Sequence, residues 1–169
     1  MPRTTVIGAF DHGIYGAVER VADHLPQPPA HQPRQRGWRI HAKRAILAAG
    51  ALERPIVFAG NDRPGVMLAG AVRSYVNRHG VLPGRETVLF TAGDDGWTTA
   101  RDIAAAGGKV AAIVDPRPAD PTRKALADKL GARLFAGGAV MVARGGRQLS
   151  GVTIRDASGA VIELSCDLL

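Results

Sequence analysis

One stretch of this 169-residue chain, residues 88–115 with the sequence VLFTAGDDGWTTARDIAAAGGKVAAIVD, limits the possible folds more than any other. It begins with a short apolar run, continues through glycines into an alanine-rich segment, and ends with a second apolar run that stops at an acid. We expect a strand at 87–91, a helix at 96–106 and a second strand at 110–114 that runs parallel to the first. This β-α-β pattern is typical of Rossmann-like nucleotide-binding domains, so the sequence predicts an α/β fold.

Further patterns flank this unit on both sides. Before it we expect an antiparallel meander at 4–10, 14–22 and 38–42 (a helix is also possible at 14–22), a short buried strand at 45–48, and a helix at 67–79. After it we expect a helix at 122–130, a third parallel strand at 132–135, and a second meander at 139–144, 149–156 and 160–166. Another apolar strand begins at 167–169.

The turn between the first parallel strand and its helix has the spacing of a dinucleotide site. In a G-x-G-x-x-G turn, glycines let a pyrophosphate approach the free N–H groups and the positive dipole end of a helix. Here the three positions are Thr91, Gly93 and Gly96, and Asp115 follows at the distance of the acid that binds ribose hydroxyls. An acid there favours NAD over NADP because it repels a 2′-phosphate, although Arg117 lies close enough to weaken this preference.

Two features of the same turn argue against simple dinucleotide binding. Thr91 replaces the glycine of the tight turn, and Asp94 and Asp95 would place carboxylates near the phosphates. Asp95 nevertheless remains a candidate cofactor-binding residue, because it lies inside this turn. The alternative is a Rossmann-shaped unit kept for packing. Trp97 at the helix start could stack on a ligand, but we expect it to pack in the core, as we do for Tyr75 on the helix at 67–79.

A second candidate site lies at the end of the strand expected at 45–48. Ala49 and Gly50 are small, and a strand that ends in small residues leaves room for a ligand or another backbone. Together with Arg54 they could lie against a flavin or a pyrophosphate, and a tightly packed domain crossover is the equal alternative. The chain has no nucleophile motif and no obvious general base, so no catalytic residue is assigned.

Composition and charge argue against several other classes of protein. The net charge is +7 and the pI is near 10.5, but the cations are dispersed and no nucleic-acid-binding motif accompanies the densest segment, 31–44, so nucleic-acid binding is not expected. The histidines lack metal-ligand spacing. No apolar run approaches the roughly 20 residues that cross a bilayer, so no membrane contact is expected. The single cysteine, Cys166, excludes an internal disulfide and fits a reducing cytosol, which predicts a cytoplasmic protein.

Three stretches resemble the α subunit of heterotetrameric sarcosine oxidase: residues 4–20 (TTVIGAFDHGIYGAVER), 44–66 (RAILAAGALERPIVFAGNDRPGV) and 88–115. The middle stretch is the most specific. The resemblance implies an oxidoreductase with two dinucleotide-binding domains that demethylates sarcosine to glycine, with oxygen giving peroxide and a one-carbon unit passing to tetrahydrofolate. It also implies two cofactors, NAD and a flavin (FAD or FMN) at a subunit interface. The implied partners are β, γ and δ subunits.

The resemblance also sets the expected domain organisation. Residues 1–62 would be part of a first dinucleotide-binding domain closed at Gly50, residues 63–84 a crossover turn and helix, and residues 85–169 a second, NAD-binding Rossmann-like domain opened by Gly93 and Gly96. The family's amino-terminal β-α-β unit and the folate region beyond Leu169 are missing, so we expect a central fragment that is inactive alone. The alternative function is a non-catalytic Rossmann-like module for subunit interaction.

Overall fold

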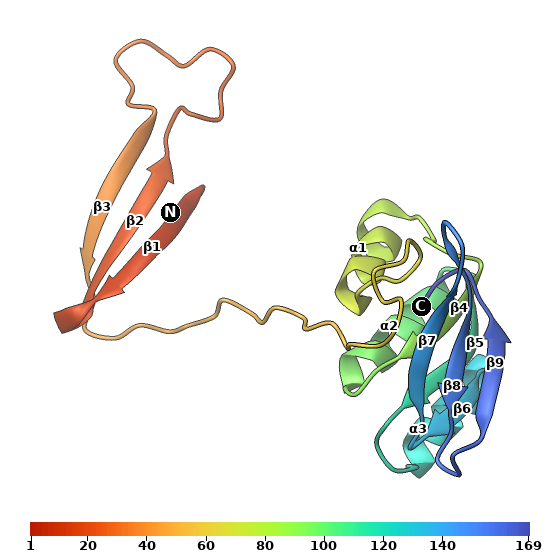
Figure 1. Ribbon diagram of the computed structural model, residues 1–169. Helices are drawn as coiled ribbons and strands as arrows, with labels where there is room; N and C mark the ends of the chain where they lie inside the picture. The colour runs from red at the N-terminus through yellow and green to blue at the C-terminus, as the bar shows by residue number, and fades with distance from the viewer. The chain divides into compact units, whose positions relative to one another are not determined.

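The computed structural model describes all residues from Met1 to Leu169, which form two compact units, Met1–Ala51 and Leu52–Leu169. The first unit is a three-stranded antiparallel sheet in the order β1-β2-β3 (Figure 1). Its strands are β1 (Thr4–Phe10), β2 (Ile14–Arg20) and β3 (Gln35–His41). The predicted first meander is therefore confirmed, and the helix considered for 14–22 does not form.

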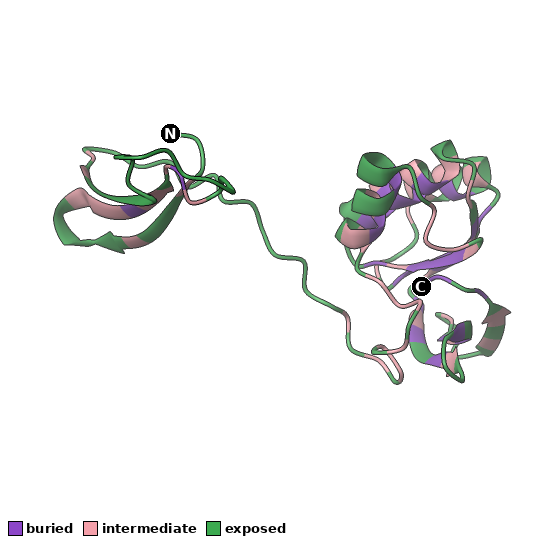
Figure 2. Cartoon of the chain, turned by 90° about the horizontal axis from the view of Figure 1, so that it is seen from above, coloured by how far each residue is buried: buried purple, intermediate pink, exposed green.

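The first unit has almost no core of its own. Within it only Ala17 and Ala22 are fully buried, whereas Val6, Ile7 and Phe10 of β1 are 61%, 67% and 62% exposed. Figure 2 shows this unit mostly in the colours of exposed and intermediate residues. The sheet is held mainly by the backbone pairing of β2 with both of its neighbours. A small sheet with an uncovered apolar face is at the limit of independent stability.

The segment 44–58 has no regular secondary structure. The prediction of a short buried strand at 45–48 is wrong, since Ile46 and Leu47 are 93% and 92% exposed. A strand needs a neighbouring strand for its N–H and C=O groups, and this stretch pairs with no strand of the chain. Leu52 and Val57 are exposed in the same way.

The second unit is built on a parallel sheet in the order β4-β5-β6. Its elements, in chain order, are α1 (Ala69–His79), β4 (Glu86–Phe90), α2 (Asp94–Ala105), β5 (Lys109–Asp115), α3 (Pro121–Leu130), β6 (Arg133–Ala136), β7 (Ala139–Gly145), β8 (Leu149–Arg155) and β9 (Val161–Ser165). The three parallel strands, the helices and the second meander are confirmed, with ends that lie within two residues of the predicted ones.

A fourth strand position lies beside β4. Leu168 forms a parallel bridge with Thr87, and its carbonyl accepts a hydrogen bond from the Val88 N–H at 2.9 Å. The apolar strand expected at 167–169 therefore joins the parallel sheet at the edge of β4 that β5 leaves free. Leu169 in turn exchanges backbone hydrogen bonds with Met67 and Gly65, and residues 63–84 belong to the second unit.

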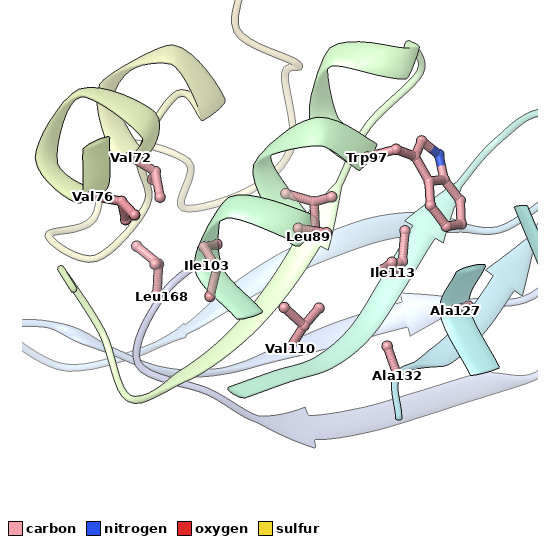
Figure 3. Packing of buried hydrophobic residues seen from close by; sticks show 11 residues of the cluster. Val72, Val76, Leu89, Trp97, Ile103, Val110, Ile113, Ala127, Ala132 and Leu168 are labelled. Carbon is pink, nitrogen blue, oxygen red and sulfur yellow. The ribbon is translucent and has the colours of Figure 1, made fainter. Parts of the chain in front are cut away.

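The parallel sheet is covered by helices on one face and by the second meander on the other. Successive strand residues alternate between the two faces: Leu89 and Ile113 belong to the cluster with α1, α2 and α3, and Val88 and Val114 belong to the cluster with β7 and β8. Figure 3 shows the helix-side cluster, to which α2 contributes the fully buried Ile103. This three-layer core fixes the carboxyl ends of β4 and β5 where the candidate site lies.

One expected core residue lies outside this packing. α1 buries Val72 and Val76, whereas Tyr75 is 46% exposed, with its ring 6.0 Å from that of His79. The expectation for Tyr75 was wrong because only a narrow stripe of this helix faces the core, and Tyr75 lies at its border.

Candidate dinucleotide-binding turn

The turn after β4 places Gly93 as the residue that precedes helix α2. Its backbone is extended, with φ −138° and ψ 170°, a conformation that any residue adopts, and an added Cβ would meet no atom within 4 Å. No side chain caps the helix there. Nothing inside the chain therefore requires a glycine at this position, and both the space beside Gly93 and the uncapped start of α2 suit a phosphate.

Thr91 closes the turn from the strand side. Its hydroxyl accepts a hydrogen bond from the Gly93 N–H at 3.1 Å and donates one to the Gly93 carbonyl at 2.9 Å. The same side chain packs against Gly96 in α2, where an added Cβ would lie only 2.3 Å from the Thr91 Oγ1. Gly96 is thus explained by close helix-to-strand packing, with no need for a ligand.

Asp115, the predicted ribose ligand, is 1% exposed and already fully hydrogen-bonded. Its Oδ2 accepts from the Trp97 Nε1 at 3.0 Å and from the Arg117 guanidinium at 2.7 Å, and its Oδ1 accepts from the backbone N–H and the Nε of Arg117 at 3.0 and 2.9 Å. Burial alone raises the pKa of Asp115, but the hydrogen bonds from Arg117 and Trp97 and the Arg117 charge outweigh it and hold the pKa below its ordinary value. A carboxylate with every acceptor position used cannot also bind ribose hydroxyls.

Arg117 connects this buried acid to the start of α2. Its guanidinium also donates to the Asp94 Oδ1 at 2.8 Å, so one side chain joins the end of β5 to the first turn of the helix. The hydrogen bonds to Asp115 and then Asp94 raise the pKa of Arg117 further above its ordinary value. The sequence pattern identified Asp115 and Arg117 as neighbours but not as partners.

The two acids after Gly93 are the first residues of α2, because the helix begins two residues earlier than predicted. Asp94 and Asp95 are both exposed. Acids in the first turn stabilise a helix through its dipole, and the same positive end is what an incoming phosphate would use. Trp97, in contrast, is 4% exposed in the helix-side cluster, which confirms the expectation that it packs.

The second candidate site consists of exposed residues. Ala49, Gly50 and Arg54 lie in the segment without regular structure, and Gly50 has a φ of +71°, which favours glycine. Their neighbour Glu53 has a defined role that the sequence did not indicate: its carboxylate accepts the N–H groups of Ala69 and Gly70 at 2.9 and 2.7 Å. No local pattern reveals this cap, because the partners are 16 and 17 positions apart.

A dinucleotide therefore fits the Gly93 turn only in part. The open space at Gly93 and the uncapped helix suit a pyrophosphate, whereas the filled Asp115 and the carboxylates of Asp94 and Asp95 do not. The chain contains no group of three or more acidic, histidine or cysteine side chains placed to hold a metal ion, and none of its helices has the length and apolar character needed to span a bilayer.

The fold matches solved oxidoreductases over almost all of this chain. An L-proline dehydrogenase from P. horikoshii is similar over 98% of this chain and 26% of its own, with a TM-score of 0.57 and 21% identity. A T. acidophilum thioredoxin reductase matches over 98% of this chain and 50% of its own, with a TM-score of 0.63 and 14% identity. These similarities concern the fold alone, and they confirm the predicted α/β class, a Rossmann-like parallel sheet with attached antiparallel strands.

Sequence comparison is more specific. Sarcosine oxidase subunit alpha of Rhizobium meliloti (strain 1021) is 50% identical over 153 residues, and that of Corynebacterium sp. (strain P-1) is 45% identical over 142 residues. These alignments cover 90% and 83% of this chain but 15% of each relative. No family model matches the chain. The predicted resemblance is confirmed: the chain is homologous to one stretch of the sarcosine oxidase α subunit.

Proposed function

We propose that this chain is part of an amine oxidoreductase that demethylates sarcosine oxidatively to glycine, with a dinucleotide-binding α subunit to which this stretch belongs. The observation that carries the proposal is the 50% identity to sarcosine oxidase subunit alpha over 90% of the chain. The resemblance implies that the flavin which oxidises the amine belongs to the β subunit, so that step is proposed to take place outside this chain.

The proposed cofactors are NAD and a flavin, FAD or FMN, at a subunit boundary, and the proposed partners are β, γ and δ subunits. Of the candidate residues, Ala49, Gly50 and Arg54 are exposed and free to border a bound dinucleotide. The exposed Ile46 and Leu47 next to them support a contact with further protein. A cytoplasmic location remains part of the proposal, and it is supported by the lone buried Cys166.

A second function is favoured by the filled carboxylate of Asp115: the Rossmann-like unit could serve as a non-catalytic module for subunit interaction. The two functions differ in what the assembled protein retains. An oxidoreductase component yields a complex with stoichiometric dinucleotide and flavin, whereas an interaction module yields a complex whose cofactors are unaffected by any residue of this chain.

The test is co-expression of the chain with a candidate β subunit, followed by cofactor extraction and an oxygen-consumption assay with sarcosine. We expect a complex that contains dinucleotide and flavin and consumes oxygen, and no turnover by the chain alone. Glycine, which lacks the N-methyl group of sarcosine, serves as the control substrate. A complex without dinucleotide, or turnover by the isolated chain, would contradict the proposal.

A further inference from the structure

We infer that the Gly93 turn does not bind a dinucleotide: Asp115 and Thr91 are already hydrogen-bonded within the chain, and Asp94 and Asp95 place negative charge at the open start of α2. This inference goes beyond the proposed function, which requires a dinucleotide in the enzyme but not at this turn. Three parts of the turn carry it, namely its ribose end, its phosphate end and its centre.

At the ribose end the acid has no free acceptor. Trp97 and Arg117 together fill both oxygens of Asp115, and Arg123 adds its charge at 3.9 Å. For Asp115 to receive a ribose hydroxyl, Arg117 or Trp97 must leave it. Either departure leaves a carboxylate that is 1% exposed with fewer partners, and a buried charge without partners is strongly unfavourable.

At the phosphate end the local charge is unfavourable for an anion. Asp94 and Asp95 extend from the first turn of α2, and the guanidinium of Arg117 is already shared between Asp94 and Asp115. Counting formal charges, the three acids Asp94, Asp95 and Asp115 exceed Arg117 and Arg123 by one. A pyrophosphate would add two negative charges beside the carboxylates of Asp94 and Asp95, which repel it.

At the centre, the side chain of Thr91 accepts a backbone hydrogen bond that a bound phosphate could otherwise accept. The Gly93 N–H points at the Thr91 hydroxyl at 3.1 Å, so this backbone donor is used inside the chain. Gly96 is accounted for by the contact with Thr91, which leaves Gly93 as the one residue of the pattern that the chain itself does not explain. The opposing possibility, that Arg117 turns from Asp94 to a phosphate on binding, is decided by titration.

The experiment titrates NAD⁺, NADH and NADP⁺ into the full chain by calorimetry. The wild-type chain is expected to bind none of them below millimolar concentration. A Thr91→Gly/Asp94→Asn/Asp95→Asn variant restores the glycine and removes the two exposed charges, and we expect it to bind at least about tenfold more tightly. The matched control, Asp62→Asn/Asp128→Asn, changes the net charge by the same amount at exposed acids elsewhere and should not bind.

Binding by the wild-type chain that Gly93→Val abolishes would overturn the inference, and the absence of any gain in the triple variant would overturn the roles given to Thr91, Asp94 and Asp95. Circular dichroism of each variant checks that the sheet and helices are intact, and Gly93→Val is suited to this use because the added side chain meets no neighbouring atom at Cβ. In the co-expressed complex, Gly93→Val should leave the dinucleotide content unchanged, and a loss would overturn the inference. A wild-type complex with no dinucleotide contradicts the proposed function instead, while the titration still decides the inference.

Discussion

The two units of this chain both contain three-stranded sheets, yet they are stabilised in different ways. In the first unit the strands of the sheet β1-β2-β3 are paired along most of their length, but the unit buries only two alanines completely. In the second unit the sheet β4-β5-β6 is covered on both faces by apolar side chains from helices and from a second sheet. The comparison teaches that regular backbone pairing is not by itself evidence of a stable domain, because burial of apolar surface supplies most of the stability.

The largest expected difference is between the two units expressed alone. We expect residues 52–169 to unfold cooperatively with heat, because both of their core clusters are internal, and we expect residues 1–51 to show no cooperative transition. Differential scanning calorimetry of the two pieces measures this. A cooperative transition in residues 1–51 would mean that backbone pairing suffices there and would remove the contrast.

The next largest effect concerns the apolar side chains. Ile103→Ala in α2 removes a 1% exposed side chain and should lower the free energy of unfolding by about 3 kcal/mol. Ile7→Ala in β1 removes a side chain that is 67% exposed and should change it by less than about 0.5 kcal/mol. Urea denaturation of the full chain carrying each substitution, followed by the circular dichroism of the helices in the second unit, measures the two changes. Equal effects would show that Ile7 is covered.

Ion pairs give the third contrast. Arg117→Met leaves the buried Asp115 with Trp97 and one backbone N–H, and the loss expected is about 2 kcal/mol, reduced from the value for a fully buried pair because Arg117 is partly exposed. Arg34→Met breaks the exposed pair with Asp23 in the first unit and should have no measurable effect. Urea denaturation compares the two. A similar loss in both variants would contradict the distinction between buried and exposed pairs.

The smallest effect separates two glycines of one turn. Gly96→Ser places a Cβ 2.3 Å from the Thr91 Oγ1 and should destabilise the second unit by about 1 to 2 kcal/mol. Gly93→Ser places its Cβ in open space and supplies a side-chain cap to α2, so stability should stay the same or rise slightly. Thermal melts of both variants measure this. Destabilisation by Gly93→Ser would show that the space beside Gly93 is filled.

Much of the fold could be predicted because its signals are local. The run from Val88 to Asp115 contains its own strand, turn, helix and strand, and Asp120 caps α3 through the N–H of Arg123. The strand expected at 45–48 failed for a non-local reason: its apolar residues are typical of a buried strand, but the chain offers no partner for it. The residue types of a segment show that it can form a strand, but they do not show whether the chain provides a neighbouring strand for it.

The candidate site was predictable in position but not in bonding. Spacing placed Gly93, Gly96 and Asp115 at one corner, and the structure brings them together there. That Arg117 fills Asp115, or that Trp97 donates to it, depends on the rotamers of side chains from two elements, which no spacing rule contains. The same limit applies to Glu53, whose partners at the start of α1 are set by the path of the chain.

The strand position beside β4 has a consequence for synthesis. The Val88 N–H has its acceptor on Leu168, and the Arg85 N–H has its acceptor on the Asp167 carboxylate 82 positions later. Between them the chain forms α2, β5, α3, β6 and the whole second meander. On a translating ribosome, β4 must therefore wait with one edge unpaired until residue 168 has emerged, and such long sequence separations slow folding. An unpaired strand edge is a place where chains pair wrongly and aggregate, so this interval is the aggregation-prone stage of folding.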